Sequence, residues 1–181
     1  ILGTSKDGGM VNMNSKELHD RMKRLRFYGA EKTYYAQEQG YNSRLDEIHA
    51  SILLTKLPHI DEYIDRRREI AAIYDKELAD TSLILPFVED YGKHAYYLYV
   101  IRHPKRDEII AKLKEHNIFV NISYPWPIHT MTGYQYLGYK EGDFPETEAA
   151  AKEILSLPMY PTLSNEEVMY VCDVIHKILN E

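Results

Sequence analysis

The amino-acid sequence predicts an α/β fold, because strand-like and helical patterns alternate along its second half. Residues 95–102 (AYYLYVIR) are rich in β-forming side chains, residues 105–115 have helical periodicity, and residues 118–122 are again strand-like. Two strands joined by one helix favour a right-handed βαβ crossover if the strands are parallel. The content of 44% hydrophobic and 28% charged residues is that of a globular protein.

The first half of the chain is predicted to be mainly helical. Ser15 is a good N-cap for a helix that carries Leu18 and Met22 on one face, and Gly29 is suited to close it. Residues 30–41 then form a tyrosine-rich loop, and loops of about a dozen residues are often functional. This loop is therefore the first place to look for a site.

A second helix is expected from about Leu45, with an apolar stripe that we predict to be buried. The stripe consists of Ile48, Ile52 and Leu53. Polar side chains directly before this helix could hold an anionic group rigidly, or they could belong to an ordinary loop before a capped core helix. The residues alone leave both readings open.

Further helices are predicted from Ile60 to Leu78, around residues 147–154 and over residues 165–179. The run Arg66–Arg68 is interpreted as a solvated face, with a phosphate contact as the alternative. Ser164 followed by Glu167 resembles a capping box at the start of the last helix.

Composition and spacing disfavour several classes of protein. The net charge of −6 argues against non-specific binding to nucleic acid. No apolar run approaches the roughly 20 residues of a membrane span, and the histidines show no metal-ligand spacing. Cys172 is the one cysteine and cannot form an internal disulfide, so we expect a reducing, cytoplasmic compartment.

Four ordered blocks carry a resemblance to a known family. The segment GYNSRLDEI begins at Gly40, and the other blocks are DGGMV at 7–11, SYPWPIH at 123–129 and GDFPETEAAAKEILSLPMYPTLSNEEV at 142–168. Together they resemble the DegT/StrS family of pyridoxal-phosphate-dependent sugar-nucleotide aminotransferases. The resemblance implies fold type I of these enzymes. Residues 1–80 would finish the large cofactor-binding domain, with its dimer-interface loop and long helices, and residues 81–181 would form the small α/β domain.

The resemblance also implies where the cofactor is held. It covers the second half of the family domain, and it places the Schiff-base lysine immediately before Ile1, so no catalytic residue is expected within the sequence itself. Asn42 matches the family asparagine that reaches the phosphate of pyridoxal phosphate in the neighbouring subunit of a homodimer. An amide suits this contact because it donates to an anion without adding charge.

Four residues are expected to bind substrate: Tyr35, Arg44, Tyr124 and His129. The guanidinium of Arg44 could fork onto a phosphate, although an ion pair with Asp46 or Glu47 is an equal alternative. Two prolines stiffen the loop that presents Tyr124 and His129, and the resemblance places this histidine at the sugar end of the pocket. Without the resemblance, His129 is read as a surface or packed histidine.

The function that the resemblance implies is transfer of an amino group from glutamate to a nucleotide-linked keto-deoxysugar. The YNSRLDEI and SYPWPIH variants look most similar to those of members acting at C3 of a dTDP-linked 3-keto-6-deoxyhexose. Two alternatives remain open. One is a sugar dehydratase of the same fold, in which histidine replaces the lysine, and the other is a non-catalytic dimerisation or binding module.

Overall fold

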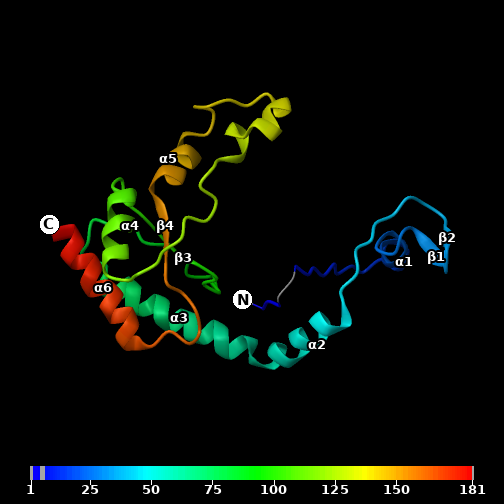
Figure 1. Cartoon of the computed structure of the whole chain (residues 1–181), viewed down its shortest axis with the longest axis horizontal. Coiled ribbons are helices and arrows are strands. Elements are labelled where there is room, and N and C mark those ends of the chain that lie inside the picture. The colour runs from blue at the N-terminus through cyan, green and yellow to red at the C-terminus, as the bar shows by residue number, and fades with distance from the viewer. Residues whose placement is uncertain (1, 5–6, 181) are drawn as a thin grey trace. The chain divides into compact units, whose positions relative to one another are not determined.

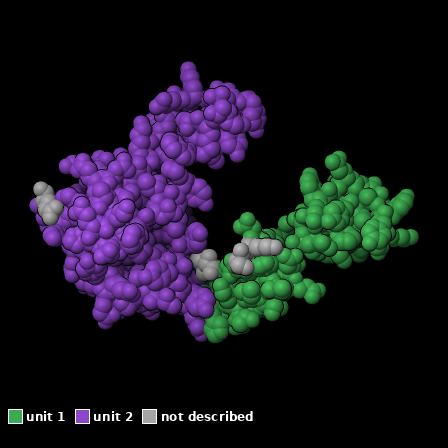
Figure 2. Space-filling model, viewed as in Figure 1, with its two compact units in different colours: residues 1–60 green, residues 61–181 purple. Residues whose placement is uncertain are grey.

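The structure is a computed structural model that describes residues 2–4 and 7–180. The chain divides into two compact units, residues 1–60 and residues 61–181, which Figure 2 shows in separate colours. The predicted division near residue 80 concerns the domains of the family, and it stays a prediction.

Helices and short strands alternate along the chain, as Figure 1 shows. The first unit holds α1 (Lys16–Leu25), β1 (Ala30–Lys32), β2 (Tyr35–Ala36), α2 (Glu47–Lys56) and the 3-10 turn η1 (Leu57–His59). From Ile60 onward follow α3 (Ile60–Glu77), β3 (Tyr99–Arg102), α4 (Arg106–Glu115), the 3-10 helices η2 (Ile128–Thr130) and η3 (Thr132–Leu137), α5 (Pro145–Glu153), β4 (Ile154–Leu157) and α6 (Asn165–Asn180). The predicted α/β class is confirmed.

The sheet of the second unit is consistent with the predicted crossover and adds a strand to it. Strands β3 and β4 are antiparallel, with Arg102 opposite Ile154. Residues 118–122 form one bridge, from Asn121 to Ser156, and it is also antiparallel to β4. Strand β3 and the segment around Asn121 therefore run parallel to each other, as the crossover requires. Strand β4, from much later in the chain, lies between them, which the sequence did not predict.

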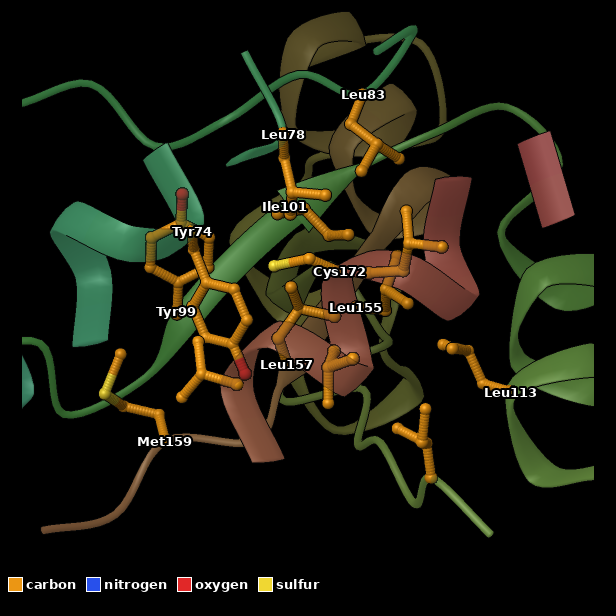
Figure 3. Close-up of a cluster of buried hydrophobic side chains, with 14 of the residues drawn as sticks. Tyr74, Leu78, Leu83, Tyr99, Ile101, Leu113, Leu155, Leu157, Met159 and Cys172 are labelled. Carbon is orange, nitrogen blue, oxygen red and sulfur yellow. The ribbon is translucent and has the colours of Figure 1, made fainter. Parts of the chain in front are cut away.

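Helices α3, α4 and α6 bury their apolar faces in one core around this sheet (Figure 3). The rings of Tyr74 and Tyr99 lie 4.9 Å apart between centroids, and both hydroxyls have acceptors, Pro158 O and the Asp75 carboxylate. Burial raises the pKa of both tyrosines, so they stay protonated and donate. Helix α6 contributes one apolar face, made of Val168, Val171, Cys172, Ile175 and Ile178.

The arginine run in α3 is not simply a solvated face. Arg67 is buried, and its Nη1 donates to the carbonyl oxygens of Tyr96, Tyr97 and Met159 at 2.8–3.0 Å. The neighbouring Arg66 donates to Leu163 O at 2.6 Å. The reason is that a guanidinium can satisfy several carbonyls at once, which fastens α3 to two loops of the same unit.

The N-terminal helix signals behave as predicted. Ser15 Oγ accepts from the Leu18 amide at 3.3 Å. Gly29 adopts the left-handed conformation with φ of 71°, but it does not close α1 as predicted, because the helix ends at Leu25 with Arg26 as its C-cap. Ser164 and Glu167 exchange the two hydrogen bonds of a capping box, at 2.8 and 3.1 Å. The two N-terminal caps depend on neighbours in sequence, so they can be predicted without the tertiary structure.

The apolar stripe of α2 is not buried, contrary to prediction. Ile48 and Ile52 are exposed, Leu53 is half-buried, and His49 is the buried residue of this helix. Periodicity predicts that a helix face is apolar but not what covers it. Among the described residues, no helix is both long and apolar enough to cross a membrane.

The core makes a direct prediction about Leu155, which is fully buried on β4. Leu155→Ala should destabilise the second unit by about 2–5 kcal/mol, because lost burial and a cavity add together. Lys114→Ala, on the exposed face of α4, is the matched control and should change stability by less than about 0.5 kcal/mol. Hydrogen exchange of the β3 and β4 amides measures both; equal exchange in the two variants would contradict this core.

Candidate functional site

Residues 27–42 form a closed tyrosine hairpin. The Tyr28 amide donates to Tyr41 O at 2.9 Å, and the Tyr41 amide donates to Leu25 O at 2.7 Å. The two ends approach so closely that a Cβ on Gly29 would lie 1.7 Å from Glu38 O, and one on Gly40 would lie 2.1 Å from the Gly29 amide nitrogen. Only glycine fits this crossing, so the hairpin ends in one fixed geometry.

A carboxylate fastens the hairpin to α1. Glu38 accepts from Arg21 Nε at 3.1 Å and from the Arg24 guanidinium at 3.2–3.3 Å. The hydrogen bond from Arg21 is the main reason why the pKa of Glu38 lies below its usual range. Glu38 is therefore occupied within the chain and is not a free group for a ligand.

Asn42, at the end of this hairpin, and Arg44, two residues after it, have exposed side chains. Asn42 pairs with Phe27 through the backbone, while its side-chain amide forms no hydrogen bond within the described part of the chain. The guanidinium of Arg44 lies 5.5 Å from the Phe27 ring centroid, a cation–π distance. The alternative of an ion pair of Arg44 with Asp46, Glu47 or another acid stays open. Both side chains are exposed and could reach an anion.

The structure brings Arg44 together with the DGG turn. Arg44 lines a pocket of about 790 Å³ whose wall includes residues 7–11. A Cβ on Gly8 would lie 3.5 Å from Leu45 Cδ1, so the two segments are in contact distance. The Arg44 guanidinium in this pocket, and the Asn42 amide two residues earlier, which does not line it, are donors of the kind that bind a phosphate.

The tip of the hairpin presents aromatic side chains outward. Tyr35 is exposed on β2, and Tyr34 beside it is fully exposed with φ of 64°. A non-glycine residue in the left-handed region is uncommon and often accompanies a functional loop. Substrate contact by Tyr35 stays a prediction.

A second group of candidates lies in residues 123–144, here called the proline-rich segment. Tyr124 is 83% exposed and has φ of 62°, and Trp126 is 70% exposed. The expected presentation of Tyr124 by a stiff loop fits this geometry. Its contact with a sugar stays a prediction.

His129 is buried instead of exposed. It is 8% exposed, and its Nε2 lies 2.8 Å from Glu148 Oε1. The Phe144 ring packs edge-on against the imidazole at 4.8 Å between centroids. The imidazole and two backbone amides that donate to Glu148 lower the pKa of this carboxyl, the imidazole most. A carboxylate only accepts, so His129 Nε2 is the donor.

Both His129 and Glu148 line a pocket of about 730 Å³. Trp126 and Tyr139 contribute aromatic surface to it, and Lys152 contributes a positive charge. Aromatic faces with nearby polar groups suit a hydroxylated ring. His129 is packed, which matches one of the two readings from the sequence alone. It also lines this pocket, and its expected role at the sugar end stays a prediction.

Sequence reasoning missed Glu148. The residue lies in the block that resembles the family, but neither spacing nor residue type pointed to a partner 19 positions earlier. The available signal was its place in the first turn of a predicted helix, where a glutamate commonly accepts backbone amides.

The fold is that of solved aminotransferases, such as a DegT DnrJ EryC1 StrS aminotransferase from Brucella abortus, with a TM-score of 0.86 at 32% identity over 93% of this chain and 45% of that chain. A solved structure of Streptomyces venezuelae DesV, in complex with a ketimine intermediate, superposes with a TM-score of 0.88 at 32% identity. It matches 92% of this chain and 45% of DesV. The family model for the DegT/DnrJ/EryC1/StrS aminotransferases matches residues 1–176. The chain belongs to this family.

Curated relatives carry more particular names. The dTDP-3-amino-3,4,6-trideoxy-alpha-D-glucose transaminase of Micromonospora megalomicea subsp. nigra is 46% identical over 99% of this chain and 50% of its own length. The dTDP-3-amino-3,6-dideoxy-alpha-D-galactopyranose transaminase of Aneurinibacillus thermoaerophilus is 39% identical over 94% of this chain and 46% of its own length. The chain thus spans about half the length of these relatives.

The closed hairpin predicts a strong effect of one methyl group. Gly29→Ala should open the hairpin ends, because its Cβ would collide with Glu38 O and the left-handed φ is strained. Gly9→Ala, whose Cβ meets no atom within 4 Å, is the control. Limited proteolysis between residues 27 and 42 should accelerate only in the first variant; equal cleavage of both would contradict the closed geometry.

Proposed function

We propose that the protein containing this chain is a pyridoxal-phosphate-dependent sugar-nucleotide aminotransferase. It takes nitrogen from glutamate and delivers it to a keto-deoxysugar, with C3 of a dTDP-linked 3-keto-6-deoxyhexose as the acceptor. The observation that carries the proposal is the 46% identity to a dTDP-3-amino sugar transaminase along nearly the whole chain. The name of the second relative also places the amino group at C3.

Asn42 and Arg44 are the residues of this chain that hold anionic groups in this proposal. Asn42 donates its exposed amide to the cofactor phosphate in the neighbouring subunit, and Arg44 pairs with a phosphate of the nucleotide sugar. Bound pyridoxal phosphate supplies an electron sink that permits amino-group transfer. The closed hairpin holds the Asn42 donor in place before the ligand arrives, which lowers the entropic cost of binding.

Tyr35, Tyr124 and His129 contact the sugar side of the substrate in this proposal. The exposed phenols of the two tyrosines can donate to and accept from sugar hydroxyls. His129 is held by Glu148, so its free edge is oriented instead of rotating. These contacts position the keto sugar; they do not themselves move the amino group.

A homodimer in the cytoplasm is the expected assembly. The exposed apolar side chains of α2 and η1, among them Ile48, Leu54 and Leu57, support an interface there, because large exposed apolar patches commonly mark protein contacts. In such a dimer Asn42 would serve the active site of the partner subunit. The shared site then fits the exposure of the Asn42 and Arg44 side chains in the described part of the chain.

The function is tested by supplying the purified protein that contains this chain with glutamate and a dTDP-linked 3-keto-6-deoxyhexose. We expect 2-oxoglutarate and a dTDP-3-amino sugar in equal amounts, measured by mass spectrometry. Borohydride reduction and peptide mapping then identify the residue before Ile1, with a pyridoxyl-lysine expected. Loss of a sugar hydroxyl without nitrogen transfer, and a histidine at that position, would move the assignment to the dehydratases.

The role of Asn42 gives a separate prediction. Asn42→Ala should weaken binding of pyridoxal phosphate by about 10- to 100-fold, because a hydrogen bond to a charged group contributes about 1.5–3 kcal/mol. Ser43→Ala is the control, since the Ser43 side chain is exposed and makes no hydrogen bond among the described residues. Equal cofactor affinity in the two variants, measured by absorbance titration, would remove Asn42 from the site.

A further inference from the structure

The proline-rich segment has little to hold it in one conformation. Of residues 123–144, all of which are described, His129 alone is buried. The remaining aromatic side chains, including Tyr124 and Trp126, are exposed. Figure 1 shows this segment running beyond α5, away from β3 and β4. A segment without an apolar core needs another source of order, because ordering each residue costs about 1–2 kcal/mol of backbone entropy.

Glu148 orders the proline-rich segment through a single carboxylate oxygen. Its Oε1 accepts from His129 Nε2 at 2.8 Å, from the Gly142 amide at 2.8 Å and from the Phe144 amide at 3.4 Å. These donors come from the middle and the end of the proline-rich segment. We call this set, His129, Gly142, Phe144 and Glu148, the carboxylate clamp. The Glu148 side chain is only 13% exposed, so water competes weakly for these hydrogen bonds.

The clamp is fixed to the rest of its unit through α5. At the end of this helix, Glu153 pairs with Arg102 of β3 at 2.8 Å. Arg106 donates to Ala151 O at 2.9 Å, which ties α4 to the last turn of α5. The helix then continues directly into β4. The position of Glu148 is therefore set by the sheet, and Glu148 transmits that position to His129.

We propose that Glu148 is a positioning residue that orients His129 and fixes residues 129–144 in one arrangement, which sets the wall of the pocket beside His129 for the sugar ring. This inference rests on the proposed function, because it names what the clamp serves. Glu148 lines the same pocket as His129, but its Oε1 is already taken up by the three donors of the clamp, so we assign it a positioning role. Its removal should therefore impair use of the sugar and leave the amino-donor reaction intact.

The test uses three variants of the protein that contains this chain. Glu148→Ala removes all three hydrogen bonds, and Glu148→Gln keeps an acceptor oxygen without the charge. Glu146→Ala is the matched control, because Glu146 is an exposed glutamate in the same helical turn. The two half-reactions are measured separately, with glutamate alone and then with the keto sugar nucleotide.

We expect Glu148→Ala to raise the KM for the sugar nucleotide by about 10- to 100-fold, since small misplacements of positioning groups have effects of that size. The rate with glutamate and the cofactor absorbance should match those of Glu146→Ala. Glu148→Gln should recover part of the loss. An equal fall in both half-reactions, or no change in either, would overturn the proposal.

A second measurement does not depend on activity. Hydrogen exchange of the peptide covering residues 123–144 should be about tenfold faster in Glu148→Ala than in Glu146→Ala, while exchange in β3 and β4 stays the same. Unchanged exchange in the peptide would refute the clamp whatever the substrate is. A wild-type protein that aminates no sugar nucleotide would instead refute the proposed function and, with it, the substrate part of this inference.

Discussion

The antiparallel pairing of β3 with β4 forms the centre of the core of residues 61–181. Its four residue pairs place Tyr99, Ile101, Leu155 and Leu157 in the core, where helices α3 and α6 cover them. Because α5 ends where β4 begins, the same pairing fixes the direction of α5 and the location of Glu148. The proline-rich segment, which has no core of its own, inherits its position from that helix. A candidate binding surface made of exposed residues is thus ordered by buried strands some distance away.

Much of this fold is encoded in short sequence patterns, and those parts were predictable. The caps at Ser15 and Ser164 depend on residues three positions apart. Strand β4 was not predictable, because the apolar run LSLPMY has no alternation that distinguishes a strand from another buried segment. Its place between β3 and Asn121 depends on pairing between distant residues, which local patterns do not contain. The exposure of the α2 stripe was not predictable for the same reason, since periodicity does not specify which surface covers a helix face.

The candidate site likewise has residues that could be predicted from the sequence and contacts that could not. The resemblance supplied Asn42, Arg44 and Tyr124 as exposed polar or aromatic residues, and their exposure is compatible with that choice. It did not supply the residues that hold them. Glu38 meets Arg21 and Arg24 across 17 and 14 positions, and Glu148 meets His129 across 19. A charged residue in a sequence has many possible partners, and only the folded chain selects one. His129 shows the consequence, because its type suggested a ligand contact while its burial shows an oriented side chain.

The two candidate regions reach a fixed geometry by different physical means. The tyrosine hairpin is closed by backbone hydrogen bonds and by the contact of two glycines, so its order depends little on charge. The ion pair of Glu38 with the exposed Arg21 adds modestly and is screened by salt. The proline-rich segment instead depends on one shielded carboxylate. Because hydrogen bonding lowers the pKa of Glu148, its contribution is complete above the ordinary glutamate pKa and is lost only as the pH falls through the lowered value. At neutral pH the clamp is therefore fully formed, and His129 and the end of the proline-rich segment are held in one arrangement.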